Sequence, residues 1–588
     1  MYKNDTREIK GYVEIVNENI DNCKNNAVVN GNENTFSDMN QVVDSNRTVY
    51  DYAILLDDYI DLEKGMMLPN LNNKNSVGWI SNELVPRDLD GTTRNNYLEV
   101  TLNSAVTCNG LTIYFEKGIA TDFKLVLTYS DGSEKTKDIK NTDKVFYLLE
   151  KQTNLKKVYI QVNTWESDSG SERAYPIISE IDFDISFVFE NDELIEFEVV
   201  EQVSKLCFEI PTNTTTVKIP NYDKKFDYIN KSGLSSYLKE NMLIKPFIGI
   251  VTEDSGIEYT DMGIFYLTSW YNNDDSTTNF NGENIISTLS KEKSHYRKWR
   301  YDSYNPNASF IGSEKTYDYF KNMCNEWGIP YESPDETLNT CSDKALPLGT
   351  RLEQLQQLAV VGCALTYGNR NNKLLWKNLP TNILDTIPLD IMQEKPKINV
   401  KTPIGKITII SQISYSSEDE SAINIYGQSI SIEGTKDIVV PFDTPVASPY
   451  YSVTLDNGTL NRRIEADRFG KFNISANGIV TLNISAKKEE LNVSEYQEII
   501  NESSNLNIEV SSYMLHTNPS LRIPNIINNI KNNYGQYDIE FNWKQDPRIT
   551  AGSLIQIETD FGYKTMFVEQ QIFKFDGSLS GSTKGVSN

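Results

Sequence analysis

The chain has 588 residues, of which 39% are hydrophobic and 23% are charged. A chain of this length is too long for one hydrophobic core, so we expect about three to five domains. Its ordinary hydrophobic and charged fractions argue against widespread disorder. It carries 56 Lys and Arg against 82 Asp and Glu, which gives a net charge of −26. This balance opposes specific nucleic-acid binding, which needs clustered cations, and also opposes binding to anionic membrane surfaces.

Six widely spaced cysteines form no C-x-x-C pair. We expect buried, reduced thiols that behave as small hydrophobic residues in a protein made in the cytoplasm. The first residues lack the apolar core of a secretory signal, and no run of about 18 apolar residues predicts a membrane span. A protein of this kind would leave its cell by lysis or inside an assembled particle.

The N-terminal third divides into two parts. Residues 1–77 are rich in Asn and Asp and predict an N-terminal arm that becomes ordered against a partner subunit. Residues 78–190 contain alternating apolar segments at 97–102, 111–115 and 123–129, the last closed by Ser-Asp-Gly. Short strands with turns and no helix between them predict an antiparallel β-sandwich.

Four further domains are expected downstream, so the predicted fold class is mainly β and multi-domain. Residues 191–280 have the strand and turn spacing of a small β-barrel. Residues 281–400 predict an α+β domain, because 313–327 has helical apolar spacing that ends at Gly328 and 349–363 predicts a second helix. Residues 401–535 predict a β-rich domain with helices at 489–503 and 518–533. Residues 536–588 predict a second barrel segment and a C-terminal tail.

Two segments are weak copies of each other. Residues 246–250 and 553–557 are apolar strands that follow turns. Each is followed by a polar turn, a Tyr and, three residues later, a Met, which are Tyr259 with Met262 and Tyr563 with Met566. The similarity suggests a duplicated β-hairpin.

The segment FNWKQDPRITAGSLIQIETDFGYKTMFVEQQIFKFDGSLSGSTKG, at 541–585, carries a family resemblance. It resembles the closing barrel of hub-like tail proteins from phages of Gram-positive bacteria and from phage-tail-like bacteriocins. The features that carry the likeness are Trp543, Asp546-Pro547, Gly552 and the Asp-Gly-Ser that follows Phe575. Residues 194–270 look like the first barrel of that family, and 78–188 resembles a galactose-binding-like accessory module.

This resemblance implies a non-enzymatic structural subunit of a phage or bacteriocin tail, placed at the baseplate hub or tail tip. Such a subunit joins the tail tube to host-contacting parts, so its partners would be tail tube and baseplate proteins. It would be a homotrimer in which two barrels per chain supply six units to a six-fold tube. It would be made in the host bacterial cytoplasm, released by lysis and located in the virion or tail particle. DNA would pass through the assembly without specific binding.

The sequence contains few of the residues and motifs that enzymes use for catalysis. The chain contains two histidines, His295 and His516, and no serine-hydrolase, P-loop or zinc-protease motif. We therefore predict no catalytic residue, no cofactor and no metal site. A cell-wall hydrolase that used Glu326 and Asp335 near Trp327 is the least favoured alternative, because chance pairs are common among 82 carboxylates.

The main alternative is a receptor-binding tail protein that recognises a cell-surface glycan through the sandwich. Sugar sites combine aromatic rings with hydrogen-bonding side chains, and four such residues lie near predicted loops: Asn163, Trp165, Arg173 and Tyr175. The competing interpretation is that the sandwich packs against neighbouring subunits, which we favour because many sandwich loops contain such residues.

Overall fold

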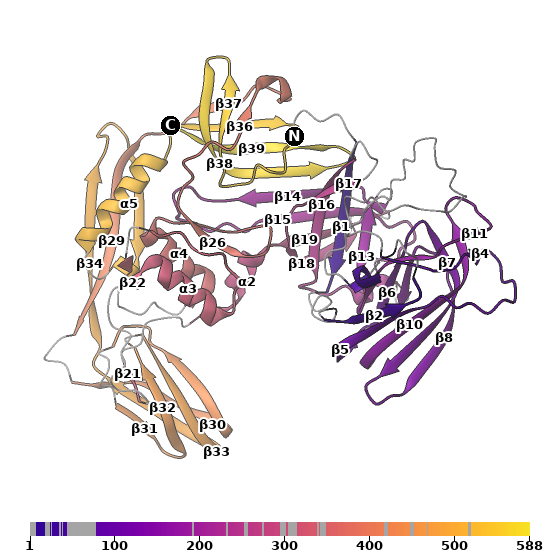
Figure 1. Cartoon of the computed structure of the whole chain (residues 1–588). Coiled ribbons are helices and arrows are strands. Elements are labelled where there is room, and N and C mark those ends of the chain that lie inside the picture. The colour runs from indigo at the N-terminus through magenta and orange to yellow at the C-terminus, as the bar shows by residue number, and fades with distance from the viewer. Residues whose placement is uncertain are drawn as a thin grey trace.

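Figure 1 shows the chain as a computed structural model. The structure describes residues 8–17, 24, 26–33, 37, 39–43, 78–190, 193–227, 229–230, 233–251, 257–272, 276–294, 301–303, 314–337, 340–341, 349–416, 421–446, 452–466, 468–515 and 519–588. Much of the predicted N-terminal arm and both histidines lie outside these residues. None of the helices in these ranges is long and apolar enough to cross a membrane.

The centre of the molecule is one 14-stranded sheet that unites the two predicted barrel regions (Figure 1). Three strands branch from its main path: β17 (Ile257–Asp261) pairs with β16, β37 (Leu554–Thr559) pairs with β38, and β27 (Thr386–Ile387) pairs with β37. The main path runs through β13 (Phe187–Glu190), β1 (Ile9–Val16), β16 (Leu243–Val251), β18 (Phe265–Asn272), β19 (Thr277–Glu283), β15 (Thr214–Pro220), β14 (Glu196–Gln202), β38 (Gly562–Phe575), β39 (Leu579–Ser587), β36 (Tyr537–Trp543) and β28 (Lys397–Val400).

The predicted mainly β, multi-domain class is confirmed, but the two barrels differ from the expectation. Among the described residues, neither barrel region closes on itself, because β14 pairs with β15 on one side and with β38 on the other. A strand that bonds to both regions makes them parts of one sheet.

A strand from the predicted N-terminal arm lies inside this sheet. β1 pairs along its full length with β16, and its residues 12–15 pair with β13. Val13 and Ile15 are completely buried. The expectation that the arm is ordered against a partner subunit is wrong for this strand, because its own chain supplies both neighbouring strands.

The predicted β-sandwich is present at the right of Figure 1. Its apolar core lies between its two sheets and includes Trp79, Phe123 and Trp165. One sheet has the order β2 (Val28–Gly31), β5 (Leu98–Cys108), β10 (Gln152–Ser167), β7 (Gly118–Tyr129) and β8 (Glu134–Lys140). The other has the order β3 (Trp79–Ile80), β12 (Ile177–Asp182), β6 (Leu111–Phe115) and β9 (Val145–Leu148), and β4 (Val85–Pro86) pairs with β11 (Arg173–Ala174) beside them.

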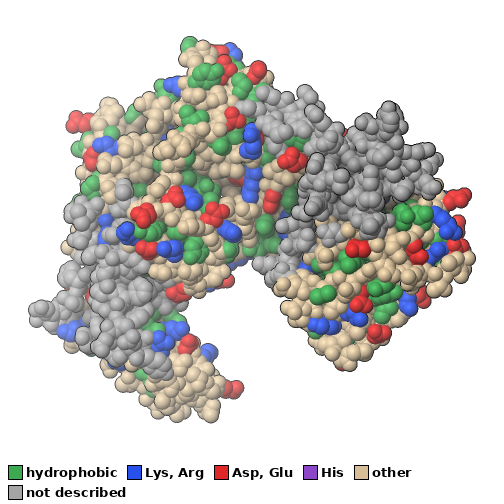
Figure 2. Space-filling view, viewed as in Figure 1, with side chains coloured by type: hydrophobic (Ala, Val, Ile, Leu, Met, Phe, Trp, Pro, Cys, Tyr) green, Lys and Arg blue, Asp and Glu red, His purple; other side chains and the backbone are tan. Residues whose placement is uncertain are grey.

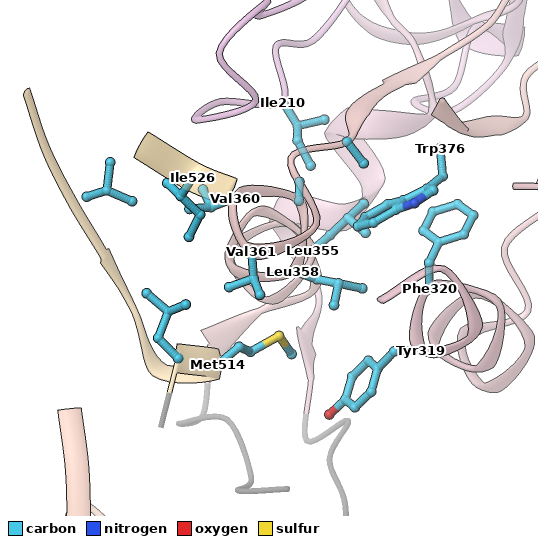
Figure 3. Close-up of a cluster of buried hydrophobic side chains, with 14 of the residues drawn as sticks. Ile210, Tyr319, Phe320, Leu355, Leu358, Val360, Val361, Trp376, Met514 and Ile526 are labelled. Atoms are coloured by element: carbon cyan, nitrogen blue, oxygen red, sulfur yellow. The ribbon is translucent and has the colours of Figure 1, made fainter. Parts of the chain in front are cut away.

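The predicted α+β region packs three helices against a hairpin. The helices are α2 (Ile285–Lys291), α3 (Thr316–Trp327) and α4 (Arg351–Gly362), and the hairpin is β25 (Leu365–Gly368) with β26 (Leu374–Lys377). Gly328 ends α3 in the left-handed conformation, as predicted, and Thr350 with Glu353 forms a capping box that starts α4. Figure 3 shows Phe320 and Trp376 facing each other beside α4, with ring centroids 5.2 Å apart.

The described part of residues 401–535 contributes strands to two sheets and contains an α-helix. The first sheet is β34 (Glu489–Ile499), β29 (Ile404–Ser416) and β35 (Leu506–Ser512). The second contains β30 (Ile423–Pro441), β33 (Phe469–Ala486), β32 (Thr459–Glu465), β31 (Ser452–Leu455) and β21 (Tyr301–Asp302). The predicted helix at 518–533 is confirmed as α5 (Pro519–Asn533). The predicted helix at 489–503 is wrong, because β34 pairs over eleven residues with β29.

Candidate functional site: the junction of two repeated β-units

The two barrel regions are two copies of one strand arrangement. Unit 1 consists of β15, β16, β17 with β18, and β19; unit 2 consists of β36, β37, β38 and β39. In unit 1 the sheet order is β16, β18, β19, β15, and in unit 2 it is β37, β38, β39, β36. The third strand of each unit therefore lies between the second and the fourth, and the fourth returns to pair with the first. Both units follow this order along the chain.

The equivalence extends to single residues at a β-bulge. Leu267 pairs with Gly282 immediately before a register shift in β18, and Val568 pairs with Gly585 immediately before a register shift in β38. A β-bulge is a specific feature of a strand pair, so its occurrence at the same position in both units is not expected by chance. Bulge and glycine therefore fix the alignment of the two units.

A second feature confirms the same alignment. The backbone N–H of Asn241 donates to the carbonyl of Leu267 over 2.9 Å, and the N–H of Gly552 donates to the carbonyl of Val568 over 2.8 Å. Both donors have positive φ, 70° for Asn241 and 90° for Gly552. Each unit thus begins its second strand from the same left-handed turn, which Asn and Gly tolerate best.

The duplication suggested by the sequence is real, but its register differs from the expected one. The sequence pattern places 246–250 against 553–557. In the structure, Ile244 pairs with Phe265 in the way that Ile555 pairs with Met566, so Ile244 is equivalent to Ile555. The apolar alternation of a strand repeats every two residues, so it matches equally well after a shift of two or four positions.

β14 joins unit 1 to unit 2 through an apolar contact. Phe197 lies opposite Val217 of unit 1 and opposite Phe575 of unit 2. The rings of Phe197 and Phe575 stack with centroids 5.5 Å apart, and Phe573 lies in the same buried cluster. β38 therefore contributes side chains to the core of unit 1 as well as to its own.

A partly buried arginine connects this junction to the α+β region. Arg370, from the turn between β25 and β26, pairs through Nε with Glu201 of β14 over 2.6 Å. Its Nη1 donates to the carbonyl of Pro547 in unit 2 over 2.7 Å, and its guanidinium lies 5.1 Å from the ring centre of Phe573. Burial raises the pKa of nearby Asp261 in unit 1, against the opposing effects of a backbone hydrogen bond and of Arg370.

A polar layer lies inside unit 2. The indole N–H of Trp543 donates to Thr583 Oγ1 over 2.8 Å, and that hydroxyl donates to Gln571 Oε1 over 2.7 Å. All three residues are fully buried. Trp543 is a core residue, and satisfied polar groups of this kind favour one packing over its alternatives.

The four predicted glycan residues do not form one exposed site. Trp165 is 1% exposed and belongs to the sandwich core, so its ring offers no platform for a sugar. Asn163 donates to Asp122 over 2.8 Å, and Arg173 pairs with Asp90 over 3.1 Å. Tyr175 packs beside a small apolar cluster. The aromatic stacking role assigned to Trp165 is therefore wrong, and glycan binding by the other three stays a prediction.

The remaining sites of the sequence prediction are placed as follows. Glu326 lies in α3, and Asp335 accepts a hydrogen bond from the backbone N–H of Asn378 over 3.0 Å. Cys108, Cys207, Cys324 and Cys363 are free thiols, as expected, and burial raises the pKa of both Cys324 and Cys363 to about 12. Within the described ranges, no group of three or more His, Cys, Asp or Glu side chains could hold a metal ion.

Sequence comparisons found no match: no protein-family model and no curated protein corresponds to this chain. Structural comparison found tail proteins. A tail protein from Neisseria meningitidis has 7% identity and a TM-score of 0.39, and the match covers 68% of this chain and 93% of that one. A 43 kDa prophage tail protein from Shewanella oneidensis has 8% identity and a TM-score of 0.37, with 68% and 95% covered. A prophage tail protein from Listeria monocytogenes has 8% identity and a TM-score of 0.34, with 68% and 91% covered.

All three neighbours are described as tail proteins, and two of them come from prophages. At such identities and TM-scores they describe a broad likeness of architecture. The residue-level equivalence of units 1 and 2 is observed directly in this chain.

Proposed function

We propose that this protein is a non-enzymatic structural subunit of a phage tail or phage-tail-like bacteriocin, placed at the baseplate hub or tail tip. The observation that carries the proposal is the repeat of unit 1 in unit 2, aligned at Leu267 and Val568. A chain with two equivalent units presents two equivalent surfaces. Three copies then present six, which matches a six-fold tube without six separate chains.

The rigid connection between the units supports this role. A ring subunit must hold its two units at a fixed angle, or the quasi-equivalent contacts around the ring would be lost. β14 provides that connection with ladders to both units, and Arg370 adds an ion pair with the buried Glu201 across it. The sandwich and the sheets of 401–515 extend away from this centre in Figure 1, where they would reach partner proteins of the tail.

The surface is consistent with contact to proteins rather than to nucleic acid. On the face shown in Figure 2, carboxylates and cations are interleaved over the middle of the molecule, without a continuous basic field. Phosphate binding depends on such a field. DNA that passes through a ring of this protein would therefore meet little attraction.

The test is the mass and position of the full chain. We expect native mass measurement to give three copies per complex, and electron microscopy of tail particles with this chain labelled to place the label at the tip. A label along the tail tube, or a complex that lacks three-fold symmetry, would contradict the proposal. Release of cell-wall fragments by the purified chain would contradict the non-enzymatic assignment.

A further inference from the structure

The repeat gives β28 a counterpart whose contacts are known. β14 precedes unit 1 and pairs antiparallel with its first strand, where Val199 lies opposite Thr215. β28 precedes unit 2 and pairs antiparallel with its first strand, where Ile398 lies opposite Ile539. The bulge alignment makes Thr215 equivalent to Ile539, so β28 is the unit 2 equivalent of β14.

The two equivalent strands differ in what lies on their second edge. The second edge of β14 is covered by β38, and Val199 is completely buried. β28 ends the path of the sheet, with no strand on its second edge in the described part of the chain. Ile398 is 40% exposed and Val400 is 79% exposed, although they lie on the same sheet face as buried Ile539. An apolar core face is therefore left open at this edge.

The strand that would cover it is also defined by the repeat. β14 pairs with β38 just beyond the bulge, where Val200 lies opposite Ile572. The equivalent part of β18 is residues 268–272. It pairs with β19 on one edge, and no strand among the described residues pairs with its other edge. Tyr271, the equivalent of Ile572, is 44% exposed.

We propose that β28 of one copy of this chain adds to the edge of β18 in a second copy and so repeats between molecules the junction that β14 makes within one. The register follows from the repeat. Asn399 lies opposite Tyr271 of the second copy as Val200 lies opposite Ile572, and Ile398 lies opposite Asn272 as Val199 lies opposite Phe573. The inference draws on the proposed function only for the number of copies.

Strand addition suits both edges. The backbone groups of an open edge gain partners, and the side chains on the core face gain cover. The contact is heterologous, because β28 of each copy meets β18 of the next. An open row of copies therefore keeps one free β28 edge and one free β18 edge at its ends until a ring closes. The angle between units 1 and 2, repeated around the ring, sets the number of copies.

Cysteine cross-linking tests the register. Opposite residues of an antiparallel pair have Cα atoms about 4.5–5.5 Å apart, which a disulfide can bridge. Full chains with Asn399→Cys and full chains with Tyr271→Cys, purified separately and mixed under mild oxidation, should form a disulfide-linked dimer. Neither variant should form it alone. Burial raises the pKa of the native Cys324 and Cys363 thiols to about 12, which disfavours the thiolate form that disulfide exchange requires.

The matched control keeps the cysteine at position 399 and places the second cysteine at a different exposed position. Tyr222 is 77% exposed outside this edge, so Tyr222→Cys mixed with Asn399→Cys should give no defined dimer. A dimer from the control pair at the same yield, or none from the test pair, would overturn the proposal.

Charge substitution tests the interface without new bonds. The double variant Ile398→Lys and Val400→Lys changes exposed residues, so it should fold while its self-association constant falls by about tenfold or more, since the charges would be buried on pairing. Ile479→Lys, at a 68% exposed residue of β33, is the control and should associate as the native chain does. Unchanged association of the double variant would refute strand addition.

The two proposals fail separately. If the particles are three-fold but Asn399→Cys and Tyr271→Cys give no disulfide, the proposed interface is wrong and the proposed hub role is unaffected. Efficient linking in complexes of another copy number, or away from the tail tip, would support the interface and sink the hub role.

Discussion

At the scale of single residues, Arg370 joins parts of the chain that are distant in sequence, since its partners include Glu201 and Pro547. Its side chain meets β14, the α+β hairpin and unit 2, with Glu201 6% exposed beneath it. A buried ion pair adds little net stability, but removal of one partner leaves a charge without compensation. Arg370 thus secures the relative placement of the units.

We predict that Arg370→Met lowers the stability of the junction by about 3–5 kcal/mol, because it leaves the Glu201 carboxylate buried and unpaired. Hydrogen exchange of the β14 and β38 amides would measure the loss. The double variant Arg370→Met with Glu201→Gln should recover part of it, because no buried charge remains. A single variant that exchanges as slowly as the native chain would show that Arg370 does not secure the junction.

A buried cation, Lys24, gives the sandwich a pH dependence. Lys24 donates to Glu180 over 2.6 Å and also pairs with Asp182, both in β12. Burial opposes the charged form of Lys24, but the two carboxylates outweigh it and raise its pKa. Burial also opposes the charge on Asp182, yet Lys24 and the hydrogen bonds around it lower the pKa of that carboxyl.

The lowered pKa of Asp182 sets the sign of the pH effect. A carboxyl whose pKa is lower in the folded state adds stability above its unfolded pKa of about 4 and loses it as the pH falls. Lys24→Met should therefore destabilise the sandwich at pH 7, and the difference from the native chain should shrink towards pH 3. Thermal unfolding followed across this range is the measurement. A difference independent of pH would contradict the charge mechanism.

At the scale of elements, the bulge of each unit depends on a glycine in the facing strand. A Cβ on Gly585 would lie 2.0 Å from the backbone carbonyl oxygen of Phe567, whereas a Cβ on Gly282 would meet side-chain atoms at 2.9–3.0 Å. Side chains can move, but a paired backbone cannot. Gly282 should therefore tolerate a larger side chain better than the equivalent Gly585 does.

We predict that Gly585→Ala destabilises the chain more than Gly282→Ala, with a loss of about 3 kcal/mol or more against about 1 kcal/mol. Gly427→Ala is the control, because a Cβ there would approach only side-chain atoms, those of Asn483 at 3.0 Å and of Asn424 at 3.5 Å. Thermal unfolding of the three variants gives the order. An equal effect at Gly282 and Gly585 would contradict the argument from backbone contact.

Elements whose conformation is set by neighbouring residues could be predicted from the sequence. Elements whose conformation is set by pairing with a distant strand could not. The end of α3 at Gly328 and the helix α5 were predicted, because caps and apolar spacing are local signals. The helix expected at 489–503 is the strand β34, whose eleven pairs come from β29, about 90 residues away in sequence. β1 was missed for the same reason, since its neighbours are far along the chain.

At the scale of the whole molecule, the fold class and the sandwich could be predicted, and the union of two barrel regions into one sheet could not. The pattern of β14 marks it as a strand, yet nothing local indicates that β38 is its second neighbour. For the candidate site, the sequence indicated that the two hairpins are similar, but it did not give the correct alignment between them. The role of Arg370 left no signal, because an arginine in a polar turn resembles any surface residue until Glu201 is placed beside it.

The position of β14 has a consequence for biosynthesis. When the ribosome has made unit 1, which ends at Glu283, the strand that must cover β14 begins only at Gly562, 279 residues later. The nascent chain therefore carries an open, apolar edge through most of its synthesis, the condition under which strands pair with the wrong molecule. A truncated product that ends before Gly562 would keep that edge permanently and should aggregate, whereas the finished chain hides it within itself.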